Sequence, residues 1–249
     1  MNTELSPYAE VELQPLLHSN GAESSRVAVV VDPQGDCFEA GVMSRDYKLI
    51  SNKAISNVAY ELLDRTDLPY EEHKVLWDGR RFKQQFVIAG MEAEVEVGDV
   101  VAVMLCAQNS YQGSLMAGLS LELLRLSCSN GLCVSHVLGK IALKHWGERD
   151  FENELRMASQ QILNVGEKVE KVLPRLKAMT QKQICRADIQ DCYRQTGLPM
   201  STRAKAFDLL EEDSEWMLYQ SITDVLTRQD SFSSENFNKK VSQYFISDN

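Results

Sequence analysis

The spacing of hydrophobic residues changes near residue 150, and this change constrains the fold more than any other feature of the chain. Before it, short apolar runs alternate with turn residues such as Asp32-Pro33-Gln34-Gly35 and Asp78-Gly79, as in strands joined by tight turns. After it, apolar residues recur every three or four positions, as on one face of a helix: Ile162, Val165, Val169, Val172, Leu176 and Met179. The sequence therefore predicts an α+β protein, with a mainly antiparallel sheet and one intervening helix, followed by an α-helical C-terminal half.

The first half should contain roughly five to seven strands. A strand over residues 26–31 returns through residues 37–42, and Asn52 is a good cap for a helix over residues 53–65. Asp78-Gly79 predicts a hairpin that joins residues 74–76 to residues 80–88. Residues 114–127 are apolar on both faces, which fits either a central strand or a strand pair bent at Gly118.

The second half should open with a helix over residues 151–179, kinked or broken at Pro174. This helix could pack on the sheet or pair with another subunit. Shorter helices should follow, with starts and stops marked by Thr180-Gln181-Lys182-Gln183, Gly197, Pro199, Ser201, Trp216 and Ser234. The chain then divides into a flexible N-terminal arm (1–25), a strand-rich core domain (26–149) and a helical region packed on that core (150–249). The arm is polar and contains two prolines, so it is either a frayed terminus or a segment that docks on a neighbour.

Composition narrows the class of protein. The 249 residues carry a formal net charge of −10, which opposes a uniformly basic nucleic-acid coat but allows one basic groove. The sequence shows no run of about 18 apolar residues and no secretory signal, so we expect a cytoplasmic protein with no membrane contact. The six cysteines lack the spacing of common zinc sites, so neither a metal nor another cofactor is predicted.

The sequence shows no established catalytic motif. Nucleophile elbow, phosphate loop, dinucleotide fingerprint and zinc-hydrolase helix are all missing from it. Cys128 and Cys133 lie near His136 and His145 along the chain, but catalytic partners are usually brought together by the fold rather than by proximity in sequence. We therefore predict a non-enzymatic protein without catalytic residues, and an uncharacterised hydrolase is the alternative.

Basic residues gather in two places that suit nucleic-acid binding. The first is the predicted hairpin, and the second follows residue 139, where Lys140 and Lys144 precede His145 and Trp146. Lysine and arginine bind phosphates, and aromatic rings stack on bases. The predicted nucleic-acid-binding residues are Arg80, Arg81, Lys83, Arg125, Lys140 and Lys144. The alternative is that these cations lie on a solvated sheet face or at a helix end.

Several segments of the chain resemble a family of phage and plasmid proteins that is known as a domain of unknown function and includes the prophage proteins YafZ and YfjQ. The segments that carry the resemblance are 44–50, 77–82, 97–99, 109–114, 125–132 and 219–224. The most specific is Arg125-Leu126-Ser127-Cys128-Ser129-Asn130-Gly131-Leu132, whereas Ser221 and Asp224 depart from the family pattern. The resemblance implies a mobile-element protein and no established activity.

The order of hairpin, helix, strands and basic hairpin also resembles that of phage single-strand annealing proteins. That resemblance implies a homo-oligomer that holds the backbone of single-stranded DNA in a basic groove without reading its sequence. We therefore expect a single-stranded-DNA-binding or annealing protein that acts in the recombination of a phage or plasmid. The alternative is a counter-defence module that binds a host protein.

Overall fold

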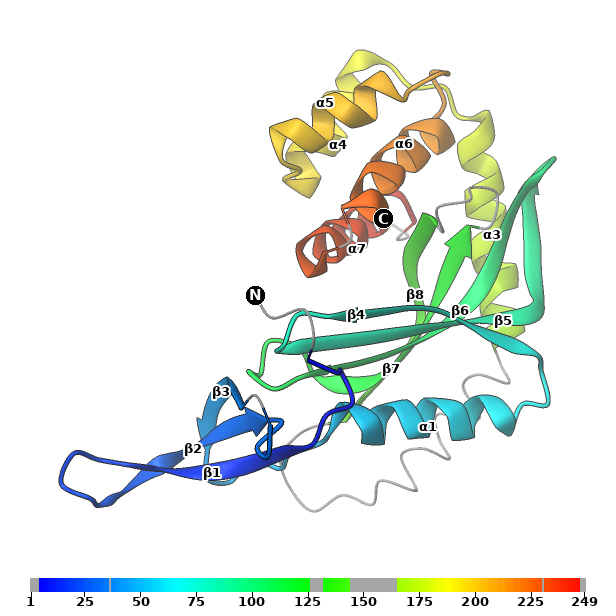
Figure 1. Ribbon diagram of the computed structural model, residues 1–249. Helices are drawn as coiled ribbons and strands as arrows, with labels where there is room; N and C mark the ends of the chain where they lie inside the picture. Colours follow the sequence, from blue (N-terminus) through cyan, green and yellow to red (C-terminus); the bar gives the residue numbers. More distant parts are fainter. Residues whose placement is uncertain (1–4, 36, 126–131, 144–164, 230, 247–249) are drawn as a thin grey trace. The chain divides into compact units, whose positions relative to one another are not determined.

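The structure is a computed structural model that describes residues 5–35, 37–125, 132–143, 165–229 and 231–246, and it confirms the α+β class (Figure 1). The strands are β1 (Val11–Leu17), β2 (Glu23–Val31), β3 (Phe38–Ser44), β4 (Tyr70–Trp77), β5 (Arg81–Glu96), β6 (Asp99–Ser110), β7 (Ala117–Arg125) and β8 (Leu132–Leu143). The helices are α1 (Asn52–Asp64), α3 (Val165–Gln181), α4 (Arg186–Thr196), α5 (Met200–Asp208), α6 (Glu215–Arg228) and α7 (Phe232–Ile246). None of the described helices is long and apolar enough to cross a membrane.

The strands form two sheets. The first has the order β1-β2-β3 and is antiparallel, with Val11 opposite Val31 and Val29 opposite Gly41. The second has the order β4-β5-β6-β7-β8, so each strand lies beside its neighbour in sequence. The connections described, from β4 to β5, from β5 to β6 and from β6 to β7, are short, as in the hairpin-built sheet that the turn residues predict.

The chain forms two compact units, each assembled from separate stretches. Unit 1 contains the described residues of Met1–Phe86, Leu105–Ser120 and Lys140–Ile162, and unit 2 those of Val87–Met104, Leu121–Gly139 and Leu163–Asn249. β5, β6, β7 and β8 each supply residues to both units.

Part of the expected N-terminal arm is regular structure. Residues Val11–Leu17 form β1, which pairs with β2 along its length. The polar stretch after Leu17 is the turn of this hairpin, where Gly21 has a φ of 80° and its amide donates to the carbonyl of His18 at 2.9 Å. Glycine adopts such a φ without strain. The polar composition of residues 18–22 is therefore that of a hairpin turn.

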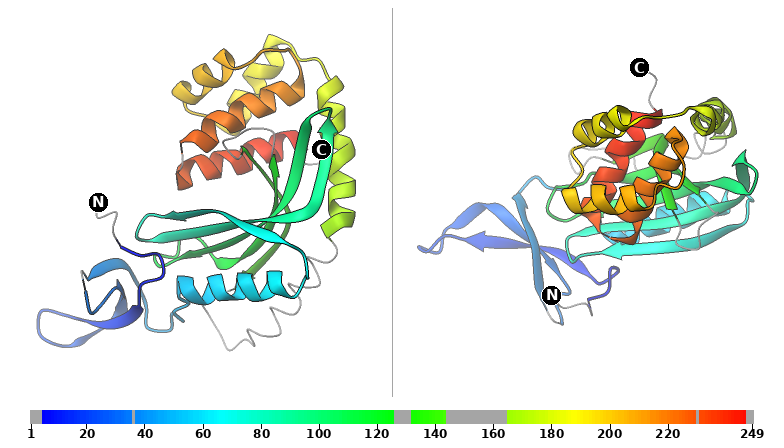
Figure 2. Two further views of the ribbon diagram at one scale, coloured as in Figure 1. Left: turned by 45° about the vertical axis from the view of Figure 1, so that its right-hand side comes forward. Right: turned by 90° about the horizontal axis from the view of Figure 1, so that it is seen from above.

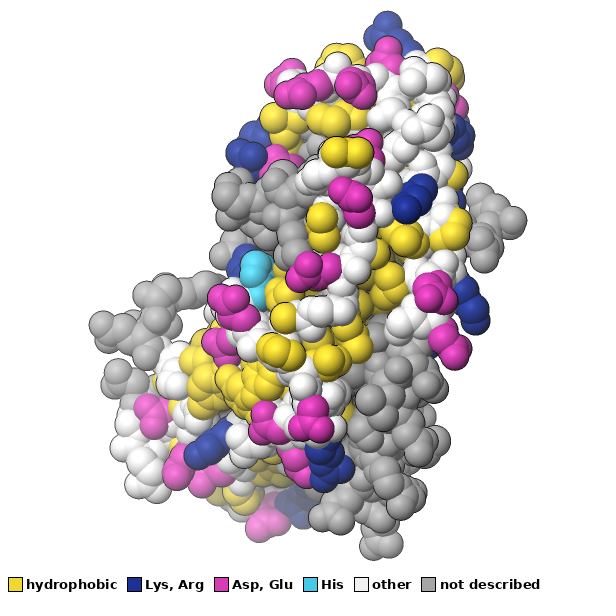
Figure 3. All heavy atoms as spheres, turned by 90° about the vertical axis from the view of Figure 1, so that its right-hand side faces the viewer, with side chains coloured by type: hydrophobic (Ala, Val, Ile, Leu, Met, Phe, Trp, Pro, Cys, Tyr) yellow, Lys and Arg dark blue, Asp and Glu magenta, His cyan; other side chains and the backbone are white. Residues whose placement is uncertain are grey.

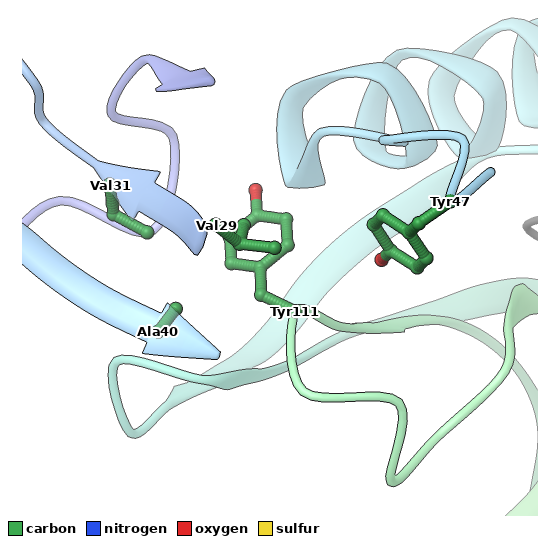
Figure 4. Close-up of a cluster of buried hydrophobic side chains, with 5 residues drawn as sticks. All are labelled: Val29, Val31, Ala40, Tyr47 and Tyr111. Atoms are coloured by element: carbon green, nitrogen blue, oxygen red, sulfur yellow. The ribbon is translucent and has the colours of Figure 1, made fainter. Parts of the chain in front are cut away.

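The first sheet of unit 1 packs on a small hydrophobic core. Val29 and Val31 of β2, Ala40 of β3, Tyr47 and Tyr111 are all buried in it (Figure 4). Helix α1 lies along the strands β4 and β5 (Figures 1 and 2), with the rings of Tyr60 and Phe86 4.9 Å apart. α1 begins as predicted, but its cap is Ser51, whose Oγ accepts from the amide of Ala54 at 3.1 Å.

Unit 2 is built around α6. This helix packs against α5 and α7 (Figure 2), and its Trp216 and Tyr219 rings stack 5.7 Å apart. Tyr219 also meets Phe245 of α7, with ring centroids 5.3 Å apart. The apolar spacing predicted that these residues face a core, and all three side chains are buried.

Three other expectations are settled by the described residues. Residues 117–125 form the single strand β7, so the chain does not bend into a strand pair at Gly118. Helix α3 runs through Pro174 to Gln181, and the part of the expected helix before residue 165 lies outside the described residues. The capping box before α4 is formed by Cys185 and Asp188 instead of Thr180 and Gln183, with the Cys185 amide donating to Asp188 Oδ2 at 2.8 Å.

Candidate nucleic-acid interface

The turn between β4 and β5 holds the first basic cluster in a fixed conformation. Asp78 Oδ1 accepts from the backbone amides of Arg80 and Arg81, at 3.0 and 2.7 Å. Gly79 has a φ of 86°, which favours glycine. An aspartate that binds the amides two and three residues later stabilises a turn, so this sequence fixes where Arg80 is presented.

Arg80 is exposed at this turn and lies over an aromatic ring. Its Cζ is 5.8 Å from the ring centroid of Phe38 in β3. Its carbonyl oxygen accepts from the amide of Tyr111 at 2.9 Å, which attaches the turn to the loop after β6. A Cβ at Gly79 would lie 3.2 Å from the Phe38 ring, so glycine allows the turn to approach the ring closely. An exposed guanidinium beside a ring can bind phosphate while the ring stacks on a base.

Arg81 is half-buried and engaged with Asp78. Its Nε donates to Asp78 Oδ2 at 2.7 Å, and its Nη2 lies 2.6 Å from the same oxygen. The carboxylate offsets the positive charge of this guanidinium locally. Arg81 therefore contributes less to the attraction of a phosphate than the sequence implied.

Lys83 is buried, with only 1% of its surface exposed, so it does not lie where a DNA strand could meet it. Gln84 and Phe86 face α1: Gln84 Nε2 donates to the hydroxyl of Tyr60 at 3.3 Å. Because side chains alternate along a strand, Lys83 points to the opposite face of the sheet. The alternative of a solvated sheet face does not hold for Lys83 either, because every side chain from Phe82 to Phe86 is buried.

The second basic cluster falls largely outside what the structure describes. Arg125 is the last residue of β7 and Lys140 lies within β8, but only their backbones are described, and Lys144 is outside the described residues. Cys128 and His145 are also outside, and the side chains of Cys133 and His136 are not described. Within the described residues, no group of three or more histidine, cysteine or acidic side chains could hold a metal ion.

Three of the family-like segments meet around Tyr111 in unit 1. The Tyr111 ring lies 6.0 Å from that of Trp77, and its hydroxyl accepts from the amide of Asn52 at 2.9 Å. Asn109 Nδ2 donates to the carbonyl of Ile50 at 2.8 Å and to Asn52 Oδ1 at 3.0 Å. Burial raises the pKa of the Tyr111 hydroxyl to about 12. These segments therefore join the first sheet, α1 and the Arg80 turn.

No pattern of residues along the chain indicates this network. Residues 108–113 are polar and end in glycine, a composition typical of a turn, but Gln108 to Ser110 complete β6 and are buried. Polar composition alone does not distinguish an exposed turn from a buried hydrogen-bonded segment. The close packing of β3 provides a structural reason: a Cβ at Gly41 would lie 2.7 Å from the carbonyl oxygen of Tyr111.

Charged residues are dispersed on the face seen in Figure 3. Lysine and arginine side chains lie singly there among acidic, polar and hydrophobic ones and form no continuous basic strip over the described residues of this face. Elsewhere, several exposed arginines have acidic partners, as in the ion pair of Arg45 with Glu23 at 2.5 Å. Attraction between one exposed guanidinium, such as that of Arg80, and a phosphate is weakened readily by salt.

Comparison with known proteins identifies a family without an assigned activity. No curated protein and no solved structure matches the chain. The family model described as Domain of unknown function (DUF932) matches residues 39–244, which include β4 to β8 and most of β3 and α7. The chain therefore belongs to the DUF932 family.

Proposed function

We propose that this protein binds single-stranded DNA without reading its sequence, as an annealing protein of a phage or plasmid does in recombination. The observation that carries the proposal is the exposed Arg80 guanidinium, held beside the Phe38 ring by the turn at Asp78. The resemblance of several segments to YafZ- and YfjQ-type prophage proteins supports the mobile-element origin.

One arginine and one ring per chain make a weak site. A single phosphate contact contributes little at physiological salt, and the net charge of −10 repels DNA elsewhere. Assembly of several copies would place one Arg80 turn after another along a strand, and linked sites bind far more tightly than single ones. The proposal therefore includes a homo-oligomer as the DNA-binding form.

The test is fluorescence anisotropy with a labelled oligothymidylate of about 30 nucleotides, beginning at about 50 mM salt. We expect Arg80→Ala to weaken binding and to reduce the slope of log K against log salt by about one for each protomer engaged. Phe38→Leu keeps an apolar side chain but removes the ring, and we expect affinity to fall at least about five-fold, as for loss of one stacked base.

The matched control is Lys53→Ala, which removes one exposed cation of α1 and should leave affinity unchanged. Absence of binding by the unmodified protein at about 50 mM salt would refute the proposal. Equal affinities of the Arg80→Ala and Lys53→Ala variants would show that the Arg80 turn is not the site.

A second candidate function is the capture of a host protein by a counter-defence module. It is favoured by one observation in unit 2, where Met200 and Phe207 expose 77% and 56% of their surface on α5. Exposed apolar side chains that lie together mark interaction sites more often than isolated ones do.

A further inference from the structure

Helix α5 carries its large apolar residues on the side that faces solvent. Thr202 and Ala206 are buried, and Thr202 Oγ1 accepts from Gln229 Nε2 at 3.2 Å, so this side of the helix faces α6. Met200 and Phe207 are exposed. A surface helix normally buries its large apolar residues and exposes its polar ones. In α5 the two small residues face inward instead.

The outward apolar residues form one continuous stripe. Met200, Ala204 and Phe207 are separated by four and three residues and are all exposed. At about 100° per residue, they lie within roughly 60° of arc on the helix surface. The direction of this stripe is nearly opposite to that of Thr202 and Ala206. The stripe is therefore an apolar face of α5 on which no other described element packs.

The residues that follow the stripe are acidic. Asp208, Glu211, Glu212 and Asp213 are all exposed, and Lys205 is the basic residue that lies among the exposed positions of α5. The C-terminal end of a helix also carries partial negative charge. A partner that covers the stripe would meet this negative potential, so its own polar residues should be basic.

The size of the stripe indicates the kind of partner. α5 has nine residues, about 13.5 Å of helix at 1.5 Å per residue. A stable dimer buries about 800 Å² on each partner, more than one short helix face with two large side chains supplies. A single helix laid against another needs only a few apolar anchors. The stripe thus fits one segment of a partner better than a second copy of this chain.

We propose that Met200, Ala204 and Phe207 of α5 dock a basic amphipathic helix of a partner protein. The inference rests on the second candidate function and is independent of DNA binding, because Arg80 belongs to unit 1 and α5 to unit 2. A failure to bind single-stranded DNA would leave it standing, and a failure of the docking test would leave the DNA proposal standing.

The test uses the full chain and a fluorescein-labelled model peptide of about five helical turns, in which leucines at helical spacing alternate with lysines. A peptide of the same composition with scrambled order is the second probe, because it keeps the charge and loses the apolar face. We expect micromolar binding of the amphipathic peptide and at least about ten-fold weaker binding of the scrambled one.

The variants separate apolar from ionic binding. Met200→Ser and Phe207→Ser should each weaken binding of the amphipathic peptide about ten-fold, as loss of an interface anchor does. The matched control is Val97→Ser, which removes a side chain that is 98% exposed elsewhere in unit 2, and it should bind as the unmodified protein does. Circular dichroism establishes that each variant is folded.

Two results would overturn the proposal. Equal binding of the amphipathic and scrambled peptides would show attraction by charge alone. A concentration-dependent increase in mass that Phe207→Ser abolishes would show that a second copy of the chain covers the stripe. The proposal is supported if Met200→Ser and Phe207→Ser weaken binding of the amphipathic peptide while Val97→Ser leaves it unchanged. The scrambled peptide should also bind the unmodified protein more weakly than the amphipathic one.

Discussion

The carboxylate of Asp99 links β6 to α6, and its removal should destabilise unit 2 strongly. Asp99 is only 3% exposed, and its Oδ2 accepts from Trp216 Nε1 at 2.8 Å and from Gln220 Nε2 at 2.7 Å. Asp99→Ala would leave both donors buried without this acceptor. Each buried donor that loses its acceptor costs about 1–3 kcal/mol, so we expect a loss of about 2–6 kcal/mol in unfolding free energy. Asp99→Asn keeps one oxygen acceptor and should lose less, about 1 kcal/mol.

The measurement is urea denaturation followed by circular dichroism, with unfolding free energies compared at a common slope. Glu92→Ala is the matched control, because Glu92 is an exposed carboxylate on the neighbouring strand β5. Trp216→Phe removes the indole N–H and gives a double-mutant cycle with Asp99→Ala. The two losses should be non-additive by at least about 1 kcal/mol, since both variants remove the same hydrogen bond. Additive losses, or an Asp99→Ala loss within about 0.5 kcal/mol of that of Glu92→Ala, would refute the assignment of this link.

Two further predictions concern unit 1 and the tyrosines. Gly41→Ala should destabilise the protein by about 1–3 kcal/mol in the same denaturation assay, because its Cβ would lie 2.7 Å from the Tyr111 carbonyl oxygen, whereas Gly166→Ala meets no atom within 4 Å and should be neutral or stabilising. Equal effects of the two variants would contradict the packing at β3. Burial raises the pKa of Tyr111 to about 12, and burial with a hydrogen bond to Glu72 raises that of Tyr60 to about 12. An unfolded tyrosine ionises near pH 10, so stability that is complete below about pH 10 should fall as the pH rises toward 12. Ultraviolet absorbance measures how much phenolate forms as the pH rises. Full ionisation of the tyrosines in a folded chain below about pH 11 would contradict the raised pKa values.

Local chemistry predicted the elements that depend on a few adjacent residues. Asp78-Gly79 forms the turn between β4 and β5 because Asp78 binds the next amides and Gly79 accepts a positive φ. Gly197 ends α4 with a φ of 65° for the same reason. The apolar spacing of α1 and α6 also identified residues that are buried, including Ile55, Leu62 and Trp216. Each of these features is determined within one turn or one helix face.

Side-chain burial and partner choice depended on segments distant in sequence. Asn52 looked like a helix cap, but its side-chain Nδ2 donates to the carbonyl of Pro7 and its Oδ1 accepts from Asn109 Nδ2. Ser51 caps α1 instead. Residues 108–110 have the polar composition of a turn, but they form the buried end of β6. A sequence pattern cannot show such pairings, because the partners are more than forty residues apart along the chain.

Residue patterns along the chain were enough to predict the fold class, most helix and strand positions, and a basic hairpin at Asp78-Gly79. The tertiary structure decided which of its cations can meet a ligand. Arg80 is exposed beside Phe38, Arg81 binds Asp78, and Lys83 is buried, although all three lie within four residues. The charge of a side chain follows from its residue type, whereas its exposure depends on what covers each face of the strand. The same distinction applies to α5, where only the packing against α6 shows that Met200 and Phe207 face outward.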